Sequence, residues 1–335
     1  FCEGEKMGLH FYDGFYGFDK DASWLGPACP TDDVLDENPT NIDHLSSSLL
    51  WYIFTLANFI FGIVIAVKYN AVKVFDKKIR TETISNNYWI AFYMLEFLRG
   101  ATYGLRYTLE SKDKPKEVED ALFLSSHIFS CFVGLALCLS LNHQRKFRSN
   151  IKSTNAGVTP ETPELPSSST SESATLLKKP ETFLALDAVD YIIILLSLVS
   201  LSSVFVVNWY KGHTFANYYF IAAYAVQRAP VVMLTFIICI NKAVDGPNMY
   251  GKLYVGFGTF FGLVDGVSVD IWAQLLPQSC TLEVASLSDL LLVVSFVSTV
   301  FYFVFVKTEY LRNMEECIWD TVSNIQNTFN FRKFS

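Results

Sequence analysis

The sequence predicts an all-α membrane protein, a bundle of seven transmembrane helices. Its composition is 51% hydrophobic and only 18% charged, against about 25% charged residues in ordinary soluble domains. The apolar residues are gathered in blocks of about 20, the length that a helix needs to cross about 30 Å of hydrocarbon. The blocks do not alternate polar with apolar positions, which disfavours a transmembrane barrel. This pattern excludes a soluble enzyme, a disordered regulator and a disulfide mini-protein.

Each apolar block is expected to be helical, because lipid offers no partner to a backbone N–H or C=O group. Residues 49–141 contain the first three spans and residues 188–306 contain the last four. The individual spans run over roughly 49–68, 88–108, 121–141, 188–209, 215–240, 253–275 and 287–306.

The distribution of Lys and Arg predicts that the N-terminus lies outside and the C-terminus in the cytoplasm. With that orientation the inner segments carry 17 basic residues and the outer segments carry six. Such a bias is the positive-inside rule. The chain begins at Phe1, so either a signal peptide has been removed or the chain has been trimmed.

Residues 1–48 form an acidic tail that is rich in aromatic residues. It is interpreted either as a solvated tail or as a cap that captures a ligand. The tail holds Cys2 and Cys29, and Cys280 lies outside as well. An oxidising setting allows one bridge among the three, and Cys2–Cys29 is preferred over Cys29–Cys280.

Two further segments belong to the inner face. Residues 142–187 are a Ser/Thr/Pro-rich loop that is expected to be disordered, either as a spacer or as a phosphorylated docking segment. Residues 307–335 have apolar positions at helical spacing and predict an amphipathic helix at the membrane surface.

Ionisable residues at membrane depth are the candidate functional residues. Each costs roughly 2.5–3.5 kcal/mol to insert, so such residues usually face the bundle interior. We expect an ion pair between Arg228 and Asp265 and a local pair on the second span. The candidates for a ligand site or an ion pathway are Glu96, Arg99, His127, Arg228, Asp265 and Asp270.

Three interpretations of these charges remain open: a structural polar core, a ligand pocket open to the outside, and a proton or ion path. Arginine favours the first two, because it does not give up its proton in proteins. Glycines at a spacing of four predict close helix contacts, within the bundle or at a homodimer seam. They are Gly100 and Gly104 in the second span and Gly258, Gly262 and Gly266 in the sixth.

Several chemistries have no signature in the sequence. It shows no Ser–His–Asp set, no zinc-ligand spacing and no Gly-rich phosphate loop, so neither an enzyme nor a metal or cofactor is expected. A net charge of -7 argues against nucleic acid as a partner.

The architecture resembles a G-protein-coupled receptor, although the motifs of the major class are missing. The third span ends Leu141-Asn142-His143-Gln144-Arg145, without an acidic-Arg-Tyr motif. The chain also resembles the orphan transmembrane protein adipocyte-associated family. That resemblance rests on Ala91-Phe92-Tyr93-Met94 with Arg99, on Leu253-Tyr254-Val255-Gly256 and on Phe301-Tyr302-Phe303-Val304-Phe305. It implies a receptor-like membrane protein and nothing catalytic.

The first functional hypothesis is therefore a receptor-like protein that binds an extracellular or lumenal ligand and passes the signal to a cytoplasmic protein. A transporter or channel and a membrane scaffold are the alternatives. The plasma membrane is the default location, and an endolysosomal membrane fits the same topology.

Overall fold

The computed structural model describes residues 41–69, 79–110, 116–156, 186–210, 214–240, 249–266 and 292–312. Within these ranges the chain forms seven helices and no strand. The predicted all-α class is confirmed for this part of the chain.

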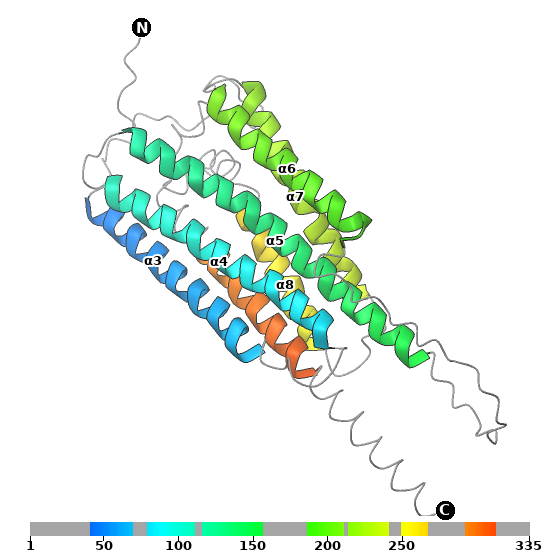
Figure 1. Ribbon diagram of the computed structural model, residues 1–335. Coiled ribbons are helices and arrows are strands. Elements are labelled where there is room, and N and C mark those ends of the chain that lie inside the picture. The colour runs from blue at the N-terminus through cyan, green and yellow to red at the C-terminus, as the bar shows by residue number, and fades with distance from the viewer. Residues whose placement is uncertain are drawn as a thin grey trace, which may run out of the picture.

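In chain order, the helices are α3 (Asn41–Val64, continued as the π-helix η1, Ile65–Tyr69), α4 (Ile79–Glu110), α5 (Lys116–Ala156), α6 (Ala188–Trp209), α7 (Thr214–Ile240), α8 (Met249–Gly266) and a last helix, Leu292–Arg312. Figure 1 shows that they share one general direction and form a bundle. We call the end where α3, α5, α7 and the last helix begin the upper end, and the opposite one the lower end. Helix α5 is central, because it packs against α4, α6 and α7.

Five helices are long and apolar enough to cross a membrane: Ser48–Tyr69, Leu124–Lys146, Ala188–Trp209, Tyr219–Ile240 and Leu292–Arg312. Their surfaces are inverted relative to those of a soluble protein. On α6, Leu195 is 60% exposed, whereas Ser200 and Ser203 are fully buried against the bundle. Apolar side chains that face outward and hydroxyl groups that face inward are expected of helices surrounded by lipid. The chain is therefore a membrane protein.

Aromatic side chains mark both ends of α6. Tyr191 near its start is 62% exposed, and Trp209 at its end is 82% exposed. At 1.5 Å per residue, the two lie about 27 Å apart along the helix. That spacing fits the two interfaces of a bilayer, where Tyr and Trp are enriched.

The helices extend past several of the predicted boundaries. Helix α4 begins at Ile79, and α5 continues to Ala156, so residues 142–156 of the expected disordered loop are helical. Residues 41–48 of the expected tail belong to α3, and the last helix reaches Arg312. Hydropathy marks only the lipid-embedded part of a helix, and these polar extensions continue beyond it. Residues 1–40, 157–185, 267–291 and 313–335 and the shorter connections lie outside the described part of the chain. The predicted disulfide cysteines Cys2, Cys29 and Cys280 are among them.

Glycines bring helices together inside the bundle. A Cβ atom on Gly100 of α4 would lie 2.5 Å from Thr55 Oγ1 of α3, and one on Gly104 would lie 2.9 Å from the ring of Tyr52. On α8, Gly258 faces Tyr302 and Gly262 faces Ser298 of the last helix. These four glycines therefore contact neighbouring helices of the same chain. The surroundings of Gly266 lie outside the described part.

Candidate functional site

A buried ion pair lies on α4. Arg99 donates from Nε to Glu96 Oε2 at 2.7 Å, and both side chains are almost fully buried. Residues three apart share one face of a helix, which places the two charges together before any neighbour packs on them. Arg99 also donates from Nη2 to Ser295 Oγ of the last helix at 2.7 Å. The predicted local pair is thus present and is tied to a second helix.

Two further charged or titratable side chains surround this pair. Arg106, two turns farther up α4, is 2% exposed, and His127 of α5 is within electrostatic range of both arginines. The His127 ring meets Phe220 of α7 edge-on, with centroids 5.4 Å apart. These residues of α4 and α5, with Ser295 of the last helix, form what we call the upper cluster: Glu96, Arg99, Arg106, His127 and Ser295.

Arg228 lies on α7, lower in the bundle, near α5 and the last helix. Its guanidinium carbon is 5.5 Å from the centre of the Tyr224 ring, a cation–π contact. It is also within electrostatic range of Cys138 and Tyr302. Its predicted ion pair with Asp265 stays a prediction, because only the backbone of Asp265 is described. Asp270 lies outside the described residues.

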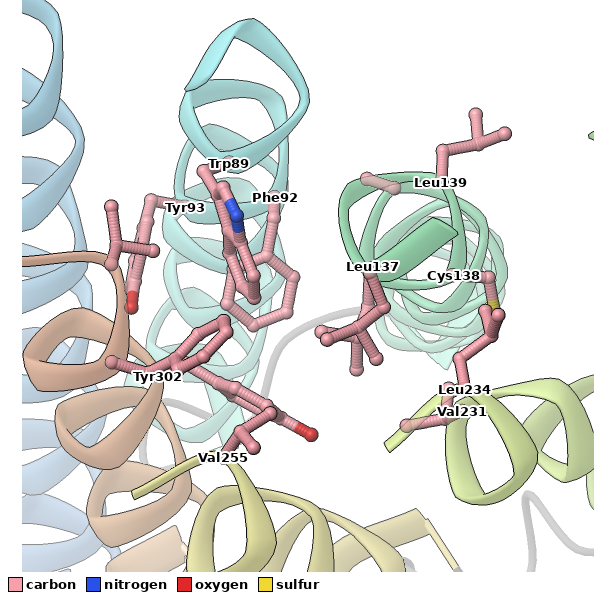
Figure 2. Close-up of a cluster of buried hydrophobic side chains, with 14 of the residues drawn as sticks. Trp89, Phe92, Tyr93, Leu137, Cys138, Leu139, Val231, Leu234, Val255 and Tyr302 are labelled. Carbon is pink, nitrogen blue, oxygen red and sulfur yellow. The ribbon is translucent and has the colours of Figure 1, made fainter. Parts of the chain in front are cut away.

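Below these polar groups lies a layer of apolar side chains, one from each of five helices. Each of the five is at most 2% exposed, and all belong to one hydrophobic cluster. We call it the apolar layer: Trp89, Leu141, Ile238, Val255 and Phe305. Figure 2 shows two members of the layer, Trp89 and Val255, gathered with Phe92 and Tyr302 in the space between α4, α8 and the last helix. Trp89 precedes Glu96 by seven residues, or about 10 Å along α4.

A second polar cluster lies beside this layer, where α5 meets the start of α6. Asp190 is fully buried and accepts hydrogen bonds from Asn142 Nδ2 at 2.8 Å and Lys146 Nζ at 2.7 Å. His143 Nε2 lies 3.6 Å from the same carboxylate, and the imidazole stacks on Tyr88 of α4. We call the group the lower network: Asn142, His143, Lys146, Asp187 and Asp190.

Asp187 both caps α6 and joins the lower network. Its carboxylate accepts from the Asp190 N–H at 2.9 Å and pairs with Lys146 Nζ at 2.9 Å, while the Asp190 side chain accepts from the Asp187 N–H. This reciprocal arrangement is a capping box. Partial burial alone would raise the pKa of Asp187. The hydrogen bonds from Asp190 and Lys146 outweigh that effect and lower the pKa to about 2.

A further contact joins α5 to the last helix at the same depth. Gln144 Nε2 donates to Glu309 Oε2 at 3.4 Å, and Arg312 Nη2 lies 3.4 Å from the same oxygen. The lower end of α5 is therefore held by polar contacts to α6 on one side and to the last helix on the other.

Glu96, Arg99 and His127 of the upper cluster are among the residues predicted from the sequence, whereas Arg106, Ser295 and the lower network are not. Asn142, Lys146, Asp187 and Asp190 were assigned to the inner loop or to the edge of a span. A signal was present, because an Asp-x-x-Asp pattern immediately before an apolar block predicts a capped helix start. The partner of Asp190 could not be inferred, because it requires knowing that α5 extends past residue 141.

Among the described residues, no group of three or more His, Cys, Asp or Glu side chains could hold a metal ion. Comparison of the chain with protein-family models, with curated proteins and with solved structures found no match. The candidate site is therefore interpreted from its own geometry.

Proposed function

We propose that the protein is a receptor-like membrane protein with seven spans. Helices α4 and α8 would be the two additional spans. Each connects a helix that ends at the lower end with one that begins at the upper end, so each must traverse the bundle (Figure 1). The 32 residues of α4 extend about 48 Å, and the 18 described residues of α8 extend about 27 Å.

We further propose that the upper end faces the extracellular or lumenal side. The support comes from charge near the lower ends of the helices. Six described cationic side chains lie there: Lys68, Arg145, Lys146, Lys252, Lys307 and Arg312. Three described acids lie at the same level, Asp187, Asp190 and Glu309. An excess of Lys and Arg is typical of the cytoplasmic side.

The observation that carries the receptor proposal is the apolar layer. An open transport path needs polar groups or water along its length, and an apolar constriction closes such a path. Here five buried apolar side chains, one from each of five helices, lie in one hydrophobic cluster on the lower side of the upper cluster. A ligand at the upper cluster would act on the lower end by moving helices, since close-packed interiors transmit displacement.

In this proposal, ligand recognition uses the polar side chains of the upper half. Arg99, Glu96, His127 and Arg228 are the described candidates, and Asp265 and Asp270 remain candidates from the sequence. The lower network would face a cytoplasmic partner, because it lies where α5 continues beyond the apolar span to Ala156.

Reconstitution into sealed liposomes tests the proposal. Proton and K⁺ flux is measured under an imposed potential, with empty liposomes as the control. We expect no flux above the control. In parallel, a panel of small carboxylic acids, amines and lysolipids is screened by thermal shift. At least one compound should raise the Tm of the wild type but not that of Arg99→Gln. Flux above the control would contradict the receptor proposal and favour a transporter or channel.

A further inference from the structure

The middle of α7, a helix that packs against α5, contains a proline, Pro230. Proline has no backbone N–H, so the carbonyl of Val226 loses its helical partner. The proline ring also crowds that carbonyl, and prolines are the usual sites of kinks in helices. The next helical bond, between Gln227 C=O and Val231 N–H, belongs to the same turn. In lipid, a backbone group that loses its helical partner needs another one.

A thiol from α5 lies at this bond. The Cys138 S–H donates to Gln227 O at 3.7 Å, and the Val231 N–H is within hydrogen-bonding reach of the same sulfur. Figure 2 shows the sulfur directed from α5 toward Val231 and Leu234 of α7. One side chain thus contacts both the donor and the acceptor of the same helical bond.

The side chain of Gln227 connects this turn of α7 to two other helices. Its Nε2 donates to the Cys131 carbonyl of α5 at 2.7 Å and to Ser197 Oγ of α6 at 3.1 Å. Gly134 allows the amide to lie flat on α5, because a Cβ there would be 3.0 Å from it. Gln227 is therefore fixed by backbone and side chain together, directly before the proline.

We propose that residues 226–231 of α7 form a latched hinge. The latch is the set of contacts from Cys138, the Cys131 carbonyl and Ser197 to Gln227. When the latch opens, the lower half of α7 bends away from α5 at Pro230. That half contains Ile238 of the apolar layer, so bending would loosen the packing of the layer. The hinge is a property of the helix itself and does not depend on the proposed receptor function.

A thermodynamic cycle tests whether the thiol and the proline act together. Cys138→Ala is measured in the wild type and in Pro230→Ala, using thermal unfolding in nanodiscs. Restoring the helical bond makes the thiol contact redundant, so the loss of Tm on Cys138→Ala should fall to about half or less in the Pro230→Ala background. Cys131→Ala is the matched control. It removes another buried thiol of α5 but leaves the carbonyl that Gln227 uses, so its Tm loss should be equal in both backgrounds.

Alkylation of the native thiols tests the motion. The buried Cys138 thiol reacts with N-ethylmaleimide only when the contact opens, so its rate, read by mass spectrometry, reports the hinge. We expect Pro230→Ala, which should fold because alanine favours helix, to slow alkylation of Cys138 several-fold and to leave Cys131 unchanged. Equal Tm losses in the two backgrounds, or equal Cys138 rates in wild type and Pro230→Ala, would overturn the proposal.

Discussion

The upper cluster and the lower network both place acids beside bases, but they do so in different ways. In the upper cluster, Glu96 and Arg99 are neighbours on one helix, and Arg99 also donates to the neutral hydroxyl of Ser295 on another helix. In the lower network, the carboxylate of Asp190 on α6 pairs directly with Lys146 on α5. Charge is thus neutralised within a helix in one region and between helices in the other.

The difference follows from the surroundings. At membrane depth, an unpaired charge is costly to insert, so a partner on the same helix is present whether or not the bundle has assembled. Near the membrane surface, water can hydrate Lys146 before α6 packs against α5, and the side chain remains 21% exposed afterwards. Separating an ion pair between helices therefore costs less free energy at the lower end, where such pairs can form and break.

The largest expected effect is at the upper cluster. Glu96→Gln leaves the buried Arg99 without its carboxylate and should lower the free energy of unfolding by about 3–5 kcal/mol. SDS titration in mixed micelles measures it. The double variant Glu96→Leu with Arg99→Met removes both charges and should recover most of the loss. If Glu96→Gln were as stable as the wild type, the Glu96 carboxylate would not be what stabilises the buried charge of Arg99.

An intermediate effect is expected at the lower network. Asp190→Asn should cost about 1.5–3 kcal/mol, because it weakens charged hydrogen bonds whose donor can be rehydrated. The same titration measures it. Asp187→Asn, whose side chain is 41% exposed, is the milder matched variant. If Asp190→Asn proved costlier than Glu96→Gln, the contrast between the two regions would be reversed.

The smallest effect is a pH dependence that involves Asp187. Its pKa is lowered from 3.8 to about 2 in the folded protein. The stability that it contributes is therefore present above about pH 4 and is lost as the pH falls from there toward 2. The Tm difference between wild type and Asp187→Asn should be smaller at pH 2.5 than at pH 6. Equal differences at the two pH values would contradict this assignment.

The sequence by itself determined the helical class and the apolar spans. Blocks of about 20 apolar residues leave a chain in lipid few options other than helices, and the helices contain nearly all of the predicted spans that the structure describes. It also determined the Glu96–Arg99 pair, because a spacing of three residues places two side chains together on any helix.

Only the tertiary structure decided which helices meet. The contacts of Asp190 with Asn142 and Lys146 join residues 44 to 48 positions apart, and no periodicity encodes such a pairing. The same holds for the Cys138 thiol at the Pro230 distortion and for the five side chains of the apolar layer. The physical reason is that helix formation depends on local spacing and the solvent, whereas side-chain partners depend on how the helices pack together.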